Sequence, residues 1–402
     1  MNVPTQRLPL PEFTALIAMM FATVAFSIDA MLPALPTIAA ALSPEDANRA
    51  QLVVISFVMG MGLGTFAVGP LSDRFGRRPV ILWGALLYCI ACAMAAFAPS
   101  LDLLLAARLL QGIGASAPRI VSLAMVRDQY KGREMARIVS FAMMIFSLVP
   151  AVAPLLGSFI IAAAGWRGIF VAFIAFSVCG MIWLALRQPE TLPPAARRPL
   201  SPRSLARTLV EVFSIRTVAV ATMVQTLCFA CLYAMLASTQ QIFDTTFGRA
   251  DNFPLWFALI AVLAGSASMI NAALVVRLGM RLMVRATLLM QILCSGSFAL
   301  IVAFALPALP EVVYFGLFLG WTVTVFMMAG LTLGNLNAIA LEPVGHVAGL
   351  AASGTGAIAT VVAALVAMPV GLAFNGTPLP LAIGITCFTA LGSLLMRLLP
   401  RG

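Results

Sequence analysis

A single carboxyl side chain lies deep inside an apolar stretch of this sequence. Of the fourteen acidic residues, Asp29 alone falls well within a long apolar run, and the others fall in polar loops or at the ends of such runs. An unpaired charge in hydrocarbon costs at least about 2.5–3.5 kcal/mol on insertion scales. We therefore expect Asp29 to have a partner or a task, and the chemistry open to a lone carboxyl group is reversible protonation.

A second buried charge is expected at similar depth in another apolar run. Arg108 begins the sequence RLLQGIG, in which Gln111 lies one turn later on the same helical face. At a rise of about 1.5 Å per residue, Arg108 and Asp29 reach similar depths from opposite sides of a membrane. Burial favours the neutral form of a carboxyl group and a nearby cation favours the charged form, so a group between the two can load and release a proton. A static ion pair is the alternative.

Polar or aromatic side chains inside apolar runs are candidates for a substrate cavity. Hydrogen bonding between helices explains most residues of this kind, so each has a structural alternative. For Arg119, the alternative is that its side chain extends to the interface. The candidates are Gln111, Arg119, Gln225, Tyr233, Asn271, Trp321, Asn335 and Asn337.

The loop after the second apolar run combines glycines with charges in the sequence GPLSDRFGRR, residues 69–78. Glycine permits a tight turn, and Asp73 can pair with a basic side chain and face a helix N-terminus. Such contacts would form a latch on the cytoplasmic side. Its residues are Gly69, Asp73, Arg74, Gly76, Arg77 and Arg78. A related sequence, RLGMR at 277–281, begins 203 residues after Arg74, with Val276 where the first loop has its acid.

The segments that position these residues are those of an integral membrane protein. The chain of 402 residues is 62% hydrophobic and 9% charged, whereas soluble domains are about 45–50% apolar and about 25% charged. Because a helix of about 20 apolar residues crosses a bilayer, the sequence predicts an all-α fold with twelve transmembrane helices. The predicted spans lie near 13–41, 50–70, 79–98, 101–125, 138–164, 168–187, 215–239, 254–276, 283–305, 311–337, 347–373 and 379–399.

A polar linker divides the twelve spans into two six-helix halves. The predicted domains are 1–187 and 215–402, and the linker 188–214 is rich in proline and arginine. With both termini in the cytoplasm, 19 basic residues fall on the cytoplasmic side and three in the outer loops. This bias predicts cytoplasmic termini. The net charge of +10 then needs no nucleic-acid partner, because the basic loops face anionic lipid and the cytoplasm.

The sequence does not indicate a metal site or an enzyme. The seven cysteines all lie in apolar segments, and no histidine set completes the spacing of a zinc site. A phosphate-binding loop is also missing, so we do not expect pumping driven directly by ATP.

Three motifs of the sequence resemble sequences of the major facilitator superfamily. The loop 69–78 is similar to its G-x-L-a-D-r-x-G-r-k signature, and 108–114 is similar to the R-x-x-Q-G-x-G segment of proton-coupled members. The segment 149–158 resembles in part the antiporter motif G-x-x-x-G-P-x-x-G-G. Pro154 and Gly157 match this motif, other glycine positions do not, and Pro150 adds a second kink.

The segment DAMLPALP, 29–36, is similar to the D-x-x-L-P-A-L-P sequence of the bicyclomycin and chloramphenicol resistance branch. The resemblance implies two pseudo-symmetric six-helix halves in a bacterial inner membrane, working by alternating access. It implies export of small apolar or amphipathic compounds, such as antibiotics, in exchange for protons. The energy source would be the proton gradient, with no cofactor, and the protein would work as a monomer.

Three alternatives stay open. The first is a proton symporter or a uniporter for a small metabolite on the same fold. The second is a membrane sensor that transports nothing. The third is an enzyme embedded in the membrane, although the spans contain no spaced set of His, Cys or acidic ligands.

Overall fold

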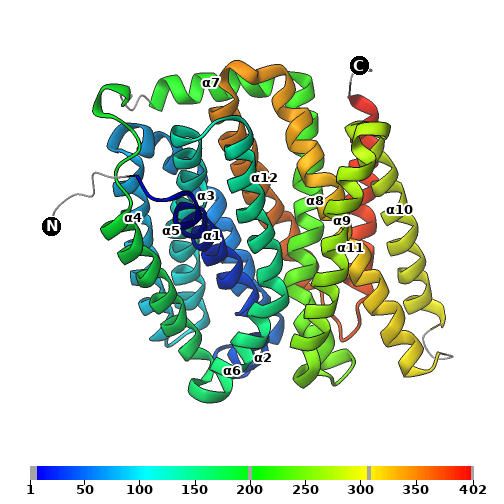
Figure 1. Cartoon of the computed structure of the whole chain (residues 1–402). Helices are drawn as coiled ribbons and strands as arrows, with labels where there is room; N and C mark the ends of the chain where they lie inside the picture. The colour runs from blue at the N-terminus through cyan, green and yellow to red at the C-terminus, as the bar shows by residue number, and fades with distance from the viewer. Residues whose placement is uncertain (1–6, 198–201, 306–308, 400–402) are drawn as a thin grey trace. The chain divides into compact units, whose positions relative to one another are not determined.

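The computed structural model describes residues 7–197, 202–305 and 309–399, and the regular elements in these residues are all helical (Figure 1). Eleven stretches in this part are long and apolar enough to cross a membrane. The longest, α6 (Gly132–Arg187), has 56 residues and is interrupted at Gly165, where φ is 69° and ψ is 178°. A straight helix of that length would measure about 84 Å, and a bilayer core is about 30 Å thick. α6 therefore supplies two spans, and the predicted all-α fold of twelve spans is confirmed.

By its contacts the chain divides into two units. The first comprises Met1–Ile38 and Ser56–Pro202, and the second comprises Ala39–Ile55 and Arg203–Gly402. The predicted division into 1–187 and 215–402 stays a prediction, and the contacts group residues 39–55 with the second unit.

The helices besides α6 are α1 (Leu10–Asp29), α2 (Leu35–Leu42), α3 (Leu52–Phe75), α4 (Arg77–Ala96), α5 (Leu101–Gln129), α7 (Pro202–Ser214), α8 (Arg216–Gln241), α9 (Phe253–Leu278), α10 (Met280–Leu300), α11 (Glu311–Leu341), α12 (Ala348–Leu372) and α13 (Leu379–Leu395).

The first predicted span is not one continuous helix. α1 ends at Asp29, a short 3-10 turn covers Leu32–Ala34, and α2 follows. Proline has no amide hydrogen and its ring clashes with the carbonyl four residues earlier. Pro33 therefore cannot bond to the carbonyl of Asp29, and Pro36 cannot bond to that of Leu32. The predicted span over 13–41 is confirmed, since Leu10–Leu42 forms one apolar stretch long enough to cross a membrane, and the break within it directly follows the acidic residue.

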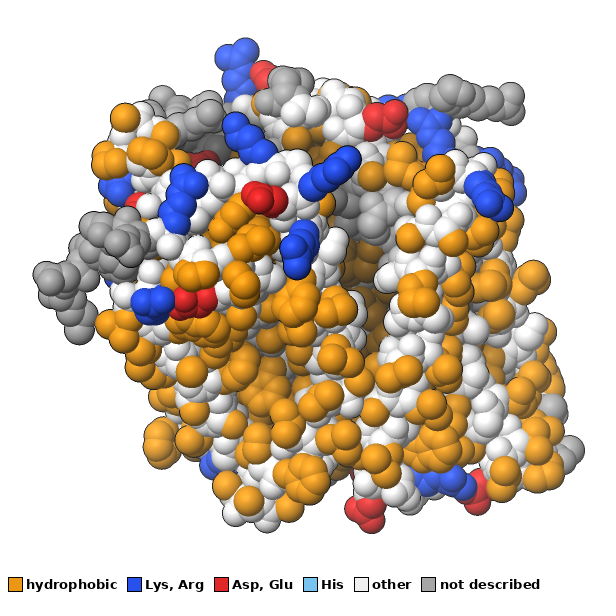
Figure 2. Space-filling view, viewed as in Figure 1, with side chains coloured by type: hydrophobic (Ala, Val, Ile, Leu, Met, Phe, Trp, Pro, Cys, Tyr) orange, Lys and Arg blue, Asp and Glu red, His pale blue; other side chains and the backbone are white. Residues whose placement is uncertain are grey.

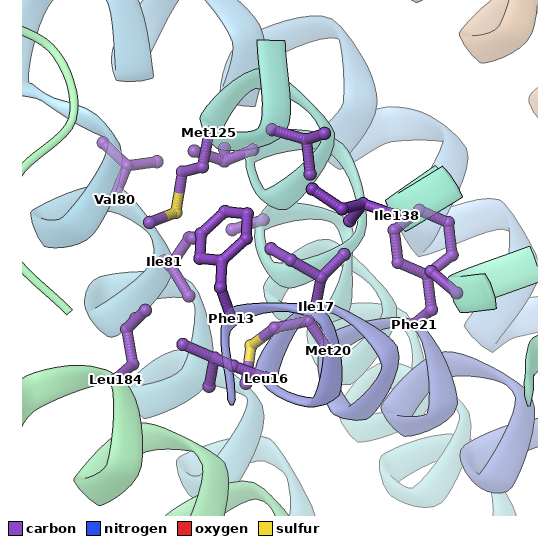
Figure 3. Close-up of a cluster of buried hydrophobic side chains, with 14 of the residues drawn as sticks. Phe13, Leu16, Ile17, Met20, Phe21, Val80, Ile81, Met125, Ile138 and Leu184 are labelled. Carbon is purple, nitrogen blue, oxygen red and sulfur yellow. The ribbon is translucent and has the colours of Figure 1, made fainter. Parts of the chain in front are cut away.

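Apolar side chains from four helices enclose the beginning of α1 (Figure 3). Phe13 and Ile17 of α1 lie among buried side chains of α4, α5 and α6, which include Ile81, Met125 and Ile138. Many large apolar side chains on the outer surface are instead exposed, and Figure 2 shows them over the sides of the helices, with charged side chains mainly at the ends. Apolar surface of this extent fits contact with lipid.

Residues 39–55 are held in the second unit by side-chain amides. Gln51 accepts a hydrogen bond from Ser238 Oγ of α8 at 2.9 Å and donates one to the carbonyl of Gly371 of α12 at 3.1 Å. Asn48 accepts a hydrogen bond from Gln241 at 2.6 Å. These bonds tie the segment before α3 to the ends of α8 and α12.

The predicted linker between the two halves includes a helix. Its second part forms α7, in which Val212 is buried in a cluster with Val218, Val344 and Ala351. Leu209, Val212 and Phe213 recur at the spacing of one helical face. The predicted linker 188–214 thus contains a helix, one face of which is apolar and packs within the second unit.

Candidate functional site

The end of α1 brings together residues of three motifs. Asp29 is the last residue of α1 and only 4% of it is exposed. Gly157 of α6 lies directly against the next residue, because a Cβ atom at Gly157 would lie 2.3 Å from the carbonyl oxygen of Ala30. Glycine at this position therefore allows the backbones of α6 and of the break in the first span to approach closely. Pro150 and Pro154 lie within α6 before this contact.

Arg108 joins α5 to the same end of α1. Its side chain is fully buried, its Nη1 donates to Gln111 Oε1 at 2.7 Å, and its Nη2 donates to the carbonyl of Ser27 at 3.1 Å. The carbonyl groups of the last turn lack partners within a helix, and a cation there is favourable. Arg108 thus contacts the backbone two residues before Asp29. A direct pairing of the two side chains stays a prediction.

Three residues that the sequence analysis did not select complete this environment. The ring of Phe57 of α3 lies under the Arg108 guanidinium, with 4.4 Å from its Cζ to the ring centroid. The hydroxyl groups of Ser27 and Tyr88 share a hydrogen bond of 2.5 Å, and both residues are buried. Tyr88 could have been selected as a rare polar aromatic residue inside an apolar run. Ser27 and Phe57 have no such signal, because many serines and phenylalanines lie in spans.

Glycines set the position of α5. A Cβ atom at Gly112 would lie 2.0 Å from the carbonyl oxygen of Phe57 in α3, and one at Gly114 would lie 2.6 Å from that of Gly84 in α4. Glycine at these two positions allows α5 to approach α3 and α4 closely. Their effect is to bring Arg108 and Gln111 close to the end of α1.

Arg119 lies further along α5 and is half-buried. Its Nη1 lies 3.3 Å from the sulfur atom of Met61 in α3. This contact joins α5 to α3 and does not distinguish a substrate contact from a side chain that extends to the interface.

The loop between α3 and α4 forms the predicted ion pair. Arg77 binds Asp73 Oδ1 at 2.5 Å and Asp128 Oδ2 of α5 at 3.0 Å. Gly76 has φ of 103°, a conformation that favours glycine. The prediction that Asp73 pairs with a basic side chain is confirmed, and Arg77 is that side chain. Of the other predicted latch residues, Gly69 accepts from Ser72 Oγ through its carbonyl, the Arg74 guanidinium lies over the Phe75 ring, and Arg78 binds the carbonyl of Ala185.

The start of the linker also binds this loop. Glu190 accepts hydrogen bonds from the backbone amides of Arg77 at 2.9 Å and Arg78 at 3.1 Å, which begin α4. Thr191 donates to Asp128 at 3.0 Å. A carboxylate is favoured at a helix N-terminus. At α4 this carboxylate belongs to Glu190, which the sequence analysis missed because it lies more than 100 residues away in the chain.

The candidates of the second unit are not all in one place. Asn335 of α11 donates to Asn271 of α9 at 2.7 Å, and Trp321 donates to Ser295 of α10 at 2.9 Å while stacking on Phe298. These bonds join helices, which supports the structural alternative for Asn271, Asn335 and Trp321.

Three further candidates of this unit have other environments. Gln225 is buried, and its Oε1 has no hydrogen-bond partner among the described residues. Tyr233 stacks on Phe229, and Asn337 is half-buried. Gln225 is therefore the candidate with an acceptor open to another group.

Comparison with known proteins identifies the family of this chain. The family model of the Major Facilitator Superfamily matches residues 15–368. The chain is 27% identical over 382 residues to the uncharacterized MFS-type transporter YdgK of Bacillus subtilis, covering 92% of this chain and 90% of that protein. It is 28% identical over 283 residues to a bicyclomycin resistance protein homolog of Haemophilus influenzae, covering 69% and 70%. A chloramphenicol resistance protein of Pseudomonas aeruginosa is 41% identical over 156 residues, which are 39% of this chain and 36% of that one.

The fold is also that of solved transporters. The xylose transporter XylE of Escherichia coli, in a partially occluded inward open conformation, matches with a TM-score of 0.74 at 14% identity, over 96% of this chain and 97% of that one. The human organic anion transporter MFSD10 matches with a TM-score of 0.60 at 19% identity, over 97% and 100%. At these identities the likeness concerns the fold. The chain therefore belongs to the Major Facilitator Superfamily, and its relatives are consistent with the bicyclomycin and chloramphenicol resistance branch that its motifs resemble.

Proposed function

We propose that this protein exports small apolar or amphipathic compounds, such as antibiotics, in exchange for protons. The observation that carries the proposal is Asp29, a carboxyl group buried at a break in the first span. Relatives named for resistance to bicyclomycin and chloramphenicol support the class of substrate. The proton gradient would supply the energy and no cofactor would be needed.

Asp29 is the proton carrier in this mechanism. Loss of water around a carboxyl group favours its neutral form, and access of water favours the charged form. When the cavity opens to one side and then to the other, the group gains and loses its proton on different sides of the membrane. Arg108 positions the end of α1 through the carbonyl of Ser27, so that the carboxyl group keeps its place during the cycle.

The substrate pocket is proposed to be mainly apolar, with a few polar groups that orient the ligand. Gln225 of the second unit contributes a carbonyl oxygen that has no hydrogen-bond partner among the described residues. A sugar would need a denser set of hydrogen-bonding groups to replace its hydration. The protein would act as a monomer in the bacterial inner membrane, with both termini in the cytoplasm.

The decisive measurement is proton release on ligand binding by purified protein in weakly buffered detergent solution. Wild type should release protons when chloramphenicol binds, and Asp29→Asn should bind chloramphenicol without release. Asp251→Asn is a matched control, because it removes an exposed carboxyl group in the short 3-10 turn before α9. Release by a folded Asp29→Asn protein equal to that of wild type would exclude Asp29 as the carrier.

Direction of transport needs a separate experiment. Inverted membrane vesicles with an acidic interior, so that the proton gradient is directed outward, should accumulate chloramphenicol if the protein exchanges it for protons. Accumulation only when the proton gradient is directed into the vesicles would identify a symporter instead.

A further inference from the structure

The last turn of α12 is weak by its own sequence. Pro369 lies inside this helix and has no amide hydrogen, so the carbonyl of Leu365 cannot receive the usual hydrogen bond from residue 369. Gly371 follows two residues later, and glycine is a poor helix former. The helix ends at Leu372, and Gly376, with φ of 87°, lies in the turn that follows. We therefore expect the last turn to depend on contacts with other segments.

Those contacts come from the short 3-10 turn Ala47–Gln51, which we call the strap. Asn48 uses both hydrogens of its side-chain amide at the end of α12, where it donates to the carbonyl of Leu372 at 3.1 Å and to that of Phe374 at 2.8 Å. The last carbonyl groups of a helix have no partner within that helix. The strap therefore caps α12 from a distant part of the chain.

Gln51 is the centre of this contact, and only 2% of it is exposed. Its amide nitrogen donates to the carbonyl of Gly371 at 3.1 Å and to Gln241 of α8, and its oxygen accepts from Ser238 Oγ at 2.9 Å. A Cβ atom at Gly371 would lie 2.4 Å from Gln51 Oε1. Glycine at this position thus makes room for the side chain that caps the helix, although it weakens the helix itself.

The strap leads directly into α3, which belongs to both units. The contacts group residues up to Ile55 with the second unit and those from Ser56 with the first. At its other end α3 carries Asp73, in the loop that Arg77 and Asp128 hold together. Movement of α3 with the first unit would therefore separate the strap from α12. The last turn of α12 would then lose the donors on its carbonyl groups.

We propose that the strap and the last turn of α12 form one conformational switch. The turn is helical while Asn48 and Gln51 bind its carbonyl groups, and it unwinds when the beginning of α3 leaves the second unit. The strap and the turn therefore open together, in a single step. The switch works in the same way for any substrate, so its test needs no ligand and is independent of the proposed exchange of drugs for protons.

The experiment measures hydrogen exchange of backbone amides in the purified full chain, in neutral detergent and without ligand. Amide exchange detects segments that open as cooperative units. The test variant is Gln51→Leu, which removes every hydrogen bond of this side chain. The matched control is Gln240→Leu in α8, because Gln240 is also 2% exposed and its Oε1 has no partner among the described residues.

In wild type, the amides of residues 49–55 and 370–374 should show equal protection, because one opening step exposes both segments. Gln51→Leu should accelerate exchange in both segments by equal factors of at least about ten, since several hydrogen bonds are lost at once. Gln240→Leu should accelerate neither. Acceleration at residues 370–374 alone would show a local cap without a switch and would overturn the proposal, as would exchange unchanged in both segments.

Gly371→Ala adds a test in which two effects oppose each other. Alanine is the better helix former, so it would slow exchange if the last turn of α12 were independent of the strap. Its Cβ atom displaces Gln51, so we expect severalfold faster exchange in both segments. The control is Gly356→Ala in the same helix, where a Cβ atom would have no atom within 4 Å, and exchange should be slower or unchanged. Slower exchange in Gly371→Ala would contradict the switch, even if Gln51→Leu failed to fold.

Discussion

Gly112→Ala tests how the glycines of α5 set the position of Arg108. The added Cβ atom would lie 2.0 Å from the carbonyl oxygen of Phe57 and 2.7 Å from the amide nitrogen of Met61. Both contacts are with backbone, so neither can be relieved by rotating a side chain. Ordinary van der Waals contact begins at 3.4 Å, so α3 and α5 must separate locally by about 1.4 Å.

Two opposing energies decide the effect on stability. Forcing a methyl group into a packed interface costs about 1–3 kcal/mol, and replacing glycine by alanine in a helix contributes up to about 1 kcal/mol in favour of folding. With the full helix-propensity gain, the net loss should be up to about 2 kcal/mol. Arg108 lies one turn before Gly112, so displacement of α5 also strains its bond of 3.1 Å to the Ser27 carbonyl, since such bonds fail beyond about 3.5 Å.

The assay combines thermal unfolding in detergent with proton release on binding of chloramphenicol. Gly112→Ala should unfold at lower temperature and release protons less completely. The matched control is Gly320→Ala in α11, where a Cβ atom would have no atom within 4 Å. It should unfold at the wild-type temperature or slightly above. A Gly112→Ala protein as stable as the control would refute the argument that close backbone contact positions α5.

Three further predictions concern the loop, the pocket and the topology. Asp73→Asn removes the charge that pairs with Arg77, and it should lower the transport rate at saturating substrate more than the ligand affinity; lower affinity with an unchanged rate would contradict the latch. Gln225→Leu should weaken chloramphenicol binding several-fold in an equilibrium assay without changing folding, and unchanged affinity would remove Gln225 from the pocket. Reporter enzymes fused within the linker and after the last helix should both be active in the cytoplasm, and a periplasmic signal from either would overturn the proposed orientation.

Local features of the sequence were sufficient to predict the class of fold. Long apolar runs must become helices in lipid, because each helix satisfies its own backbone hydrogen bonds. The spans and the turn at Gly76 therefore follow from residues close together in the chain. The sequence also contains a signal for the end of α1 at Asp29, because Pro33 cannot donate a hydrogen bond to the carbonyl of Asp29. The sequence analysis did not use this signal, because the apolar run continues past the break.

Contacts between distant residues were decided only by the tertiary structure. Arg108 was selected as a buried charge, but its hydrogen bond to the carbonyl of Ser27 depends on how α5 packs against α1. Glu190 was missed because nothing in its local sequence indicates a binding partner. Its carboxylate meets the beginning of α4 only through the folding of the chain. The contact of Gly157 with Ala30 places the antiporter-like segment against the break after Asp29. This contact depends on how closely the backbones of the two segments approach. Local sequence determines which segments are helical and which residues are unusual in lipid, whereas packing determines which of those residues meet, because the groups that meet are far apart in the chain.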